Sequence, residues 1–392
     1  MKRILIVAAL PLCALVATLA PLHAAGRSDE VRALWVRGTS LDSAEAIRRM
    51  VASASTAGFN TLFVQTLDDA TAAASFDPLA ETLAQAHAAG MRVHAWVDVT
   101  RVAAPGELPL SRSHVVYQHP EWLMVPRAIA AELLPVDPHS PDYLGRLARW
   151  TRTNADRVDG LYVSPLQTAA AAYVAERVRD LVRRYAVDGV YFDHVLYPAL
   201  DVDYGATSLA AFKDAMRTQL PLAERQRMDA VEAIDPFAYP NEMPEQWRYF
   251  RQSQLTALVA RLRSTVKTLR PDAIISAAVT ADAALAANNN LQDWRTWLDN
   301  GFLDALCPIA IGTSGPQMGA ELAQVRALAA GKPVWAGIGA NRLSQRETVD
   351  YIGMARKAGA QGIILFSYDS LITPPKGVDY LSAIGRDAFD GS

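Results

Sequence analysis

Apolar and polar positions along the chain follow a repeated order of helix, turn and strand. Ala-rich amphipathic segments end in a small residue plus Gly, and a short, nearly continuous apolar run follows each of them. The order recurs at Gly58, Gly90, Gly331 and Gly359, where a helix would end on a left-handed residue. Apolar runs without alternation are typical of parallel strands covered on both faces. The pattern therefore predicts a parallel sheet surrounded by helices.

Most of these apolar runs lie about thirty residues apart, the length of one strand–helix–strand unit. The predicted strands lie near Ala33, Thr61, Arg92, Gly189, Ile274, Leu303, Pro333 and Gly362. Eight parallel strands alternating with helices close into a (β/α)8 barrel, the α/β fold of the TIM-barrel type. A doubly wound open sheet is the alternative, but no Gly-rich phosphate-binding loop follows any of these strands.

Long insertions follow the third and the fourth predicted strands. Residues 102–170 include a further strand-like run at 159–164, which we assign to an accessory element outside the barrel. Residues 199–246 are rich in Pro, Asp and Tyr. Both segments leave from the carboxyl ends of strands, where barrels of this kind build their active sites. We therefore expect them to wall a cleft on that face.

The first residues of the chain have the layout of a secretory signal. Lys2 and Arg3 precede an apolar run over 4–20, and the small residues Ala24 and Ala25 follow it. This arrangement is typical of a signal peptide with an Ala-type cleavage site. A retained membrane anchor is the alternative, but two prolines interrupt the run and it is short for a membrane span.

We predict a signal peptide over 1–25 and a single barrel domain over 28–392, located in the periplasm or secreted. The length of 392 residues exceeds that of a usual single core, for which α/β barrels are a familiar exception. A net charge of −3 gives no basic patch, so no nucleic-acid partner is expected. Cys307 is the only thiol after signal removal, which excludes an intramolecular disulfide.

Acidic residues at two strand ends are the candidate catalytic groups. Asp193 ends the fourth predicted strand and Asp98 the third, and His194 follows directly. A carboxylate at the end of an apolar strand is costly to bury unless it has partners or a task. Two carboxylates at adjacent strand ends are the arrangement used for glycoside hydrolysis. The structural alternatives are an Asp193 that caps a loop or pairs with an Arg, and an Asp98 that only supports the site.

Aromatic and polar side chains at other strand ends are candidates for substrate binding. Flat aromatic faces can stack on sugar rings, although each aromatic taken singly is more often part of the core. His94 and His194 are too few and wrongly spaced for a metal site, and we expect neither a metal nor a cofactor. The candidate substrate-binding residues are Trp35, Arg37, Gln65, Trp96, Tyr191, Tyr197, Tyr368 and Asp369.

The fourth strand carries the most specific motif of the chain. Residues 184–198 read Arg-Tyr-Ala-Val-Asp-Gly-Val-Tyr-Phe-Asp-His-Val-Leu-Tyr-Pro and resemble the motif of the glycosyl-hydrolase-like family ten, also known as domain of unknown function 187. Residues 33–36, 94–96 and 119–122 (Ala-Leu-Trp-Val, His-Ala-Trp and His-Pro-Glu-Trp) resemble further segments of that family in the same order. Family members often have Asn where Asp98 stands, and many have a second Asp where His194 stands.

The resemblance implies a barrel glycosidase that acts on a bacterial polysaccharide, with peptidoglycan glycan strands as one known substrate class. Asp193 would be the essential carboxylate, with Asp98, His194 or a loop acid such as Glu242 as its partner. We therefore expect a glycoside hydrolase of an envelope or extracellular polysaccharide, with no membrane span after signal cleavage. A non-catalytic glycan-binding barrel and a non-glycosidic hydrolase on the same scaffold are the alternatives, because a fold alone does not fix chemistry.

Overall fold

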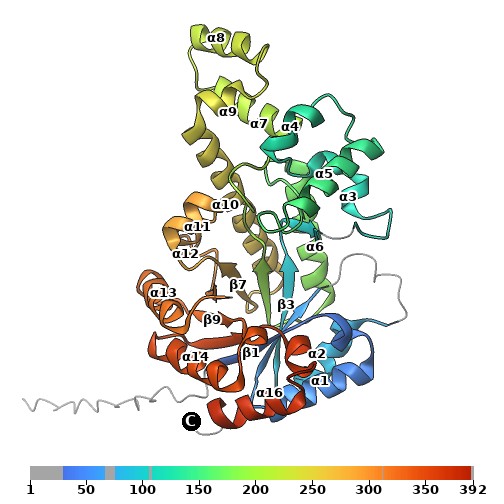
Figure 1. Ribbon diagram of the computed structural model, residues 1–392, viewed down its shortest axis with the longest axis vertical. Helices are drawn as coiled ribbons and strands as arrows, with labels where there is room; N and C mark the ends of the chain where they lie inside the picture. The colour runs from blue at the N-terminus through green and yellow to red at the C-terminus, as the bar shows by residue number, and fades with distance from the viewer. Residues whose placement is uncertain (1–29, 67–75, 106–107, 311, 390–392) are drawn as a thin grey trace, which may run out of the picture.

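The computed structural model describes residues 30–66, 76–105, 108–310 and 312–389 (Figure 1). The predicted signal peptide falls within 1–29 and lies outside the described residues. Eight parallel strands form a closed barrel in the order β1-β10-β9-β8-β7-β6-β3-β2. The strands are β1 (Val31–Val36), β2 (Thr61–Gln65), β3 (Arg92–Asp98), β6 (Gly189–Asp193), β7 (Ile274–Val279), β8 (Ala305–Ala310), β9 (Trp335–Ile338) and β10 (Gly362–Leu365). The predicted (β/α)8 barrel is confirmed.

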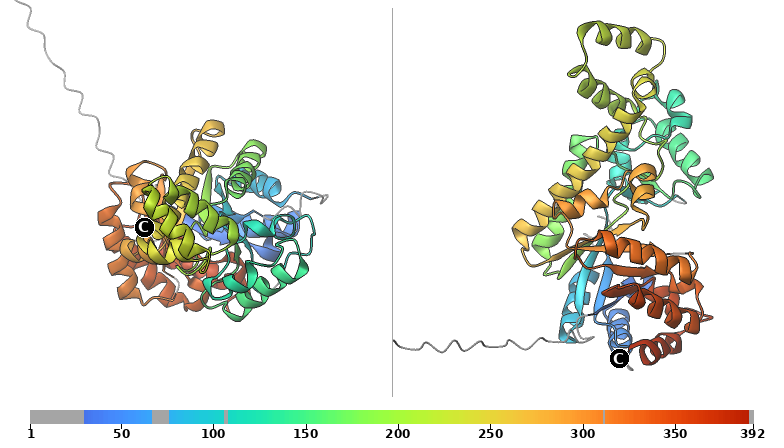
Figure 2. Two further views of the ribbon diagram at one scale, coloured as in Figure 1. Left: turned by 90° about the horizontal axis from the view of Figure 1, so that it is seen from above. Right: turned by 90° about the vertical axis from the view of Figure 1, so that its left-hand side faces the viewer.

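Helices cover the outside of the barrel, as the amphipathic pattern predicts (Figures 1 and 2). Gly58, Gly90, Gly331 and Gly359 have φ angles of 76°, 72°, 83° and 87°, so the predicted left-handed helix ends are confirmed. The covering helices are α1 (Ala44–Thr56), α2 (Pro78–Ala88), α6 (Thr168–Arg184), α10 (Pro244–Leu269), α11 (Ala283–Asn289), α12 (Trp294–Asp299), α13 (Gly315–Leu328), α14 (Gln345–Lys357), α15 (Tyr368–Ile372) and α16 (Val378–Ile384).

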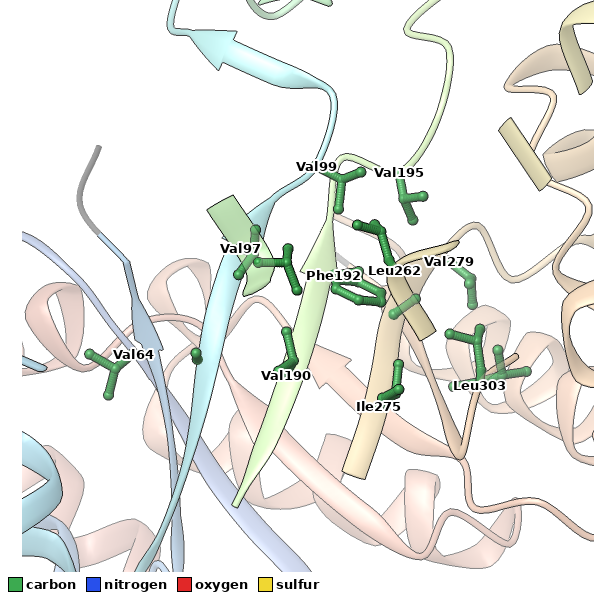
Figure 3. Close-up of a cluster of buried hydrophobic side chains, with 14 of the residues drawn as sticks. Val64, Val97, Val99, Val190, Phe192, Val195, Leu262, Ile275, Val279 and Leu303 are labelled. Carbon is green, nitrogen blue, oxygen red and sulfur yellow. The ribbon is translucent and has the colours of Figure 1, made fainter. Parts of the chain in front are cut away.

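Alternate residues of each strand face the helices or the barrel interior, because successive side chains point to opposite faces of a sheet. Val190 and Phe192 of β6 belong to the outer layer and lie in one cluster with Leu262 of α10 (Figure 3). Tyr191, between them in sequence, belongs to the interior cluster. The same alternation places Asp193 on the interior side, where the strand ends.

The barrel interior is tightly packed near Gly189. A Cβ atom on this glycine would lie 2.5 Å from Nδ1 of His94 and 2.7 Å from the carbonyl oxygen of Ile274. Burial lowers the pKa of His94 to about 3, and the charge of Arg92 adds to this shift, so the ring is neutral in the core. The close approach explains why glycine opens the fourth barrel strand.

The segment between β3 and α6 folds into helices and a two-stranded antiparallel sheet outside the barrel. In this sheet Arg101 pairs with Tyr162. The predicted extra strand at 159–164 is therefore an accessory element and not a ninth barrel strand. The elements are β4 (Arg101–Ala103), α3 (Val115–Gln118), α4 (Arg127–Leu133), α5 (Pro141–Thr153) and β5 (Leu161–Tyr162).

The segment after β6 contains α7 (Ala206–Arg217), α8 (Leu222–Glu232) and α9 (Ala238–Glu242), and α10 then returns to the barrel. These helices and the start of α10 share a separate cluster centred on Phe212, Tyr239 and Trp247. Both long segments lie on the side of the barrel toward which β3 points (Figure 1). None of the helices in the described residues combines the length and the apolar character that a membrane span requires.

A buried carboxylate ties the two long segments together. Asp203 is fully buried and accepts hydrogen bonds from Ser164 Oγ at 2.7 Å, Ser208 Oγ at 2.6 Å and the hydroxyl of Tyr197 at 3.1 Å. Ser164 follows β5 in the first segment, whereas Ser208 lies on α7 in the second. The network therefore fixes the accessory sheet against the segment that follows β6.

Candidate active site

The two candidate acids lie side by side at the carboxyl end of the barrel. Asp98 ends β3 and Asp193 ends β6, and the two residues are partners in the register of these adjacent parallel strands. Each has an oxygen atom within 4.8 Å of the other and of a nitrogen of His194. The structure thus brings together all three predicted catalytic residues.

His194 turns back over the strand end because its backbone is left-handed, with a φ of 47°. Its amide donates to Asp193 Oδ1 at 2.8 Å, and its carbonyl oxygen accepts from the hydroxyl of Thr100. The imidazole Nδ1 lies 2.6 Å from Asp98 Oδ1 and 3.6 Å from Asp193 Oδ1. The alternation of the strand would place this side chain on the outer face, and the turn brings it to the acids instead.

The two carboxyl groups have pKa values that are shifted in opposite directions. Burial raises the pKa of Asp193, the charge of His194 opposes this shift, and the charge of Asp98 adds to it. Burial also acts to raise the pKa of Asp98, but the hydrogen bond and charge of His194 and the charge of Arg101 outweigh it and lower the value. At a given pH, a larger fraction of Asp98 than of Asp193 is therefore ionised.

The accessory sheet supplies three residues that our sequence reasoning missed. Arg101 Nη2 of β4 lies 3.1 Å from Asp98 Oδ2, and its Nη1 lies 3.4 Å from Asp159 Oδ2. Asp159 precedes β5 and lies 3.5 Å from His194 Nε2, and the hydroxyl of Tyr162 donates to Asp159. Burial acts to lower the pKa of His194, but the charge of Asp193 and the contacts with Asp159 and Asp98 raise it to about 10.

A cavity of about 510 Å³ opens beside Asp193 and His194, a volume typical of small-ligand sites. The first long segment contributes to its wall, whereas residues 199–246 contribute none of the described lining side chains, contrary to our expectation of two walls. The opposite wall comes from the ends of β7 and β8 and from α11 and α13. The lining residues are Asp159, Tyr162, Asp193, His194, Leu196, Pro198, Ala278, Val279, Thr280, Ala281, Asp282, Leu285, Asn290, Gln292, Ile309, Thr313 and Glu321.

Three of the predicted binding aromatics lie inside the barrel, below the acids. Trp35 is 2% exposed and Trp96 is 3% exposed, and Tyr191 is completely buried. The ring centroids of Trp35 and Trp96 lie 5.9 Å and 6.4 Å from that of Tyr191. Ala278 and Ile309 belong to the same interior cluster and also line the cavity. The aromatics therefore support the floor of the site and offer no open face for stacking in this structure.

Other predicted residues lie apart from the acids. The hydroxyl of the fully buried Tyr197, a predicted substrate-binding residue, donates to Asp203 at 3.1 Å. Asp369 accepts from the backbone amide of Arg37 at 2.8 Å, which fixes the loop after β1. Tyr368 is 3% exposed.

Arg37, Gln65 and Glu242 do not line the cavity beside Asp193. Arg37 has an exposed side chain, and its guanidinium lies 5.2 Å from the ring centroid of Phe366. Gln65 is half-buried at the end of β2. Glu242, the loop acid considered as a partner, lies on α9 and pairs with Arg227 at 3.4 Å, outside the cavity.

In the described part of the chain, one group of side chains has the spacing of a metal site, namely Asp98, Asp193 and His194. The 2.6 Å contact between His194 Nδ1 and Asp98 Oδ1 is a hydrogen bond between an imidazole and a carboxyl group, and a metal ion would have to break it. We therefore describe this group as a hydrogen-bonded acid–imidazole cluster.

Solved structures of other proteins resemble this chain in fold. The chain resembles the PgaB (BpsB) glycoside hydrolase domain from Bordetella bronchiseptica, with a TM-score of 0.57 and 13% identity over 91% of this chain and 98% of that one. It also resembles the catalytic domain of β-amylase from Paenibacillus polymyxa, with a TM-score of 0.61 and 11% identity over 92% of this chain and 99% of that one. At these identities the similarity establishes the barrel fold.

Sequence similarity identifies the family of the chain, which the shared fold alone does not. The chain is 24% identical over 287 residues to the Glycosyl hydrolase DigH of Escherichia coli (strain K12), which covers 64% of this chain and 54% of that protein. It thus spans about half the length of the curated relatives it matches. The family described as Glycosyl hydrolase-like 10 matches residues 67–334, which include both strand-end acids and the accessory sheet. The chain belongs to the Glycosyl hydrolase-like 10 family.

Proposed function

We propose that this protein hydrolyses glycosidic bonds, with Asp193 as the proton donor. One observation carries the proposal: two carboxyl groups lie within 4.8 Å of each other, and their pKa values are shifted in opposite directions. Pairs of acids whose environments separate their pKa values divide the roles of acid and base between them. Asp193 lines the cavity and would protonate the leaving oxygen of the glycosidic bond.

Asp98 is the ionised partner in this proposal. His194 and Arg101 each contact one of its oxygens and stabilise its negative charge. The carboxylate would stabilise the positive charge that develops at the anomeric carbon when the bond breaks.

We propose a polysaccharide of the bacterial envelope or extracellular matrix as the substrate, with peptidoglycan glycan strands as the first class to test. The expected signal peptide would place the enzyme with such polymers. The cavity wall is rich in carboxylate, amide and hydroxyl groups, which suit the many hydroxyl groups of a sugar. Asn290 and Gln292 are among these groups.

The test is the release of new reducing ends from peptide-free glycan strands and from a panel of polysaccharides. Asp193→Asn keeps the size of the side chain but removes its titratable proton, so turnover should fall by about 10²–10⁴-fold. Asp180→Asn, on the exposed face of α6, is the matched control and should retain full activity. Glycan binding without release by the wild-type protein would favour the non-catalytic glycan-binding barrel. Full activity of Asp193→Asn would refute the role of Asp193.

A further inference from the structure

The accessory sheet reaches into the site through residues that lie outside the barrel strands. Arg101 lies on β4, and Asp159 and Tyr162 lie before and on β5. The two strands pair with each other in an antiparallel sheet, which holds Arg101 opposite Tyr162. This pairing brings an acid from a distant part of the sequence to the imidazole of His194.

His194 has an acidic neighbour at each ring nitrogen. Nδ1 faces Asp98 at 2.6 Å and Asp193 at 3.6 Å, and Nε2 faces Asp159 at 3.5 Å. A neutral imidazole has one N–H donor and one acceptor nitrogen, whereas the imidazolium has two donors. An ionised carboxylate accepts hydrogen bonds and donates none. Acids at both ring nitrogens therefore favour the imidazolium, which donates from both nitrogens.

We infer that Asp159 is a positioning residue, which holds Nε2 of His194 so that the doubly protonated ring keeps Nδ1 on Asp98 beside Asp193. The consequence for catalysis rests on the proposed function. The accessory sheet is then part of the machinery that separates the roles of the two strand-end acids.

The contacts around Asp159 fit this role. Its side chain is 52% exposed, yet one oxygen accepts from the hydroxyl of Tyr162 and the other faces both Arg101 and His194. The ring of Tyr162 also lies edge-on to the imidazole, with centroids 6.3 Å apart. These contacts hold the carboxylate on the cavity side of the ring.

Charged groups from every surrounding element act on His194. Asp98, Asp193 and Asp159 favour its protonated form, and the pKa of His194 is raised to about 10 against the effect of burial. Arg101 contributes an opposing positive charge but bonds directly to two of these acids. The titratable groups of the surrounding elements are Asp98 on β3, Arg101 on β4, Asp159 and Tyr162 at β5, Asp193 on β6, and Asp282 and Glu321 at the cavity wall.

A purely structural role is the competing explanation, because Asp159 also forms an ion pair with Arg101. Asp159→Asn preserves the size of the side chain and one acceptor oxygen and removes the negative charge. Asp156→Asn, at an exposed acid in the turn that precedes Asp159, is the matched control. Tyr162→Phe removes the hydroxyl that holds Asp159 and provides a second variant that leaves its charge in place.

The decisive measurement is the titration of the His194 imidazole by NMR, with His194→Gln used to identify its signals. The wild-type ring and the Asp156→Asn ring should stay doubly protonated through neutral pH. In Asp159→Asn the midpoint should fall by at least about one unit, because an opposite charge within hydrogen-bonding reach shifts a pKa by about 1–3 units. Tyr162→Phe should produce a smaller shift in the same direction. An unchanged midpoint in Asp159→Asn would overturn the inference.

The activity readout separates this inference from the proposed function. On a substrate that the wild type hydrolyses, Asp159→Asn should change the pH dependence of kcat/KM, whereas Asp156→Asn should keep the pH dependence of the wild type. A shifted NMR midpoint with an unchanged pH profile would overturn the catalytic part of the inference. If the wild-type protein hydrolyses no glycan, the proposed function fails, and the NMR titration still decides whether Asp159 holds the imidazolium.

Discussion

Removal of the Asp203 carboxylate should destabilise the protein strongly. Asp203→Ala leaves three buried hydroxyl groups, those of Ser164, Ser208 and Tyr197, without their acceptor. It also leaves the guanidinium of the buried Arg251 without the opposite charge that acts on it. Breaking a buried charged network from one side costs about 3–5 kcal/mol, and we expect a loss of unfolding free energy in this range.

Asp203→Asn tests the geometry separately from the charge. The amide keeps one acceptor oxygen, and the neighbouring hydroxyl groups can rotate to accept from its NH₂ group. The unfolding free energy should therefore fall by only about 1–2 kcal/mol. Asp201→Asn is the control, because Asp201 is 43% exposed and pairs with Arg157 at 3.0 Å on the surface. An exposed pair of this kind contributes less than about 1 kcal/mol.

The same network predicts a pH dependence. Burial raises the pKa of Asp203 in the folded protein, although hydrogen bonds from Ser208 and Ser164 oppose the shift. A folded pKa above the ordinary value of 3.8 means that the protonated form stabilises the fold at low pH. This stabilisation is lost as the pH rises through the folded pKa. The stability difference between the wild type and Asp203→Asn should therefore become smaller as the pH rises from about 4 toward neutrality.

Urea unfolding followed by far-ultraviolet circular dichroism measures these differences, and hydrogen exchange at β5 (Leu161–Tyr162) shows whether the accessory sheet loosens first. A loss of unfolding free energy for Asp203→Ala no larger than that for Asp201→Asn would contradict the prediction. Unchanged exchange rates at β5 while the rest of the barrel opens would also contradict it, because the network would then not fix the accessory sheet.

Two further predictions follow from burial and from the N-terminal sequence. Trp96→Ala should lower the unfolding free energy by about 3–5 kcal/mol, because the side chain is 3% exposed in the barrel interior; weaker glycan binding at unchanged stability would contradict this and restore the stacking role. The exported protein should lack its first residues, with cleavage near Ala24 or Ala25, and mass spectrometry of the envelope and secreted fractions checks this; an intact N-terminus there would argue against a cleaved signal.

The barrel could be predicted from the sequence because each unit repeats the same local signals. Apolar runs, amphipathic helices and left-handed glycines such as Gly58 and Gly90 act over a few residues, so a single sequence contains them all. The pairing of Asp98 with Asp193 also follows, since residues that end adjacent parallel strands come to the same edge. What periodicity could not reveal was which aromatics remain open to the cleft, because that depends on packing across the whole barrel.

The accessory contributions were hidden for a different reason. Arg101 lies only three residues after Asp98, but its direction depends on the antiparallel pairing of β4 with β5 some sixty residues later along the chain. Asp159 begins a run that reads as a strand, and nothing local indicates that it faces His194. Contacts between two irregular segments depend on tertiary packing, which propensity and spacing do not specify.

The structure also explains how two acids in the same register differ in protonation. The barrel places Asp98 and Asp193 at equivalent heights on neighbouring strands, so the strands alone would give them similar surroundings. The difference comes from the loops. Asp98 contacts two cationic side chains, His194 and Arg101, whereas Asp193 Oδ1 accepts a backbone amide and lies 3.6 Å from the imidazole. The barrel thus sets the spacing of the acid pair, and the residues brought by the turn after β6 and by the accessory sheet determine which acid holds the proton.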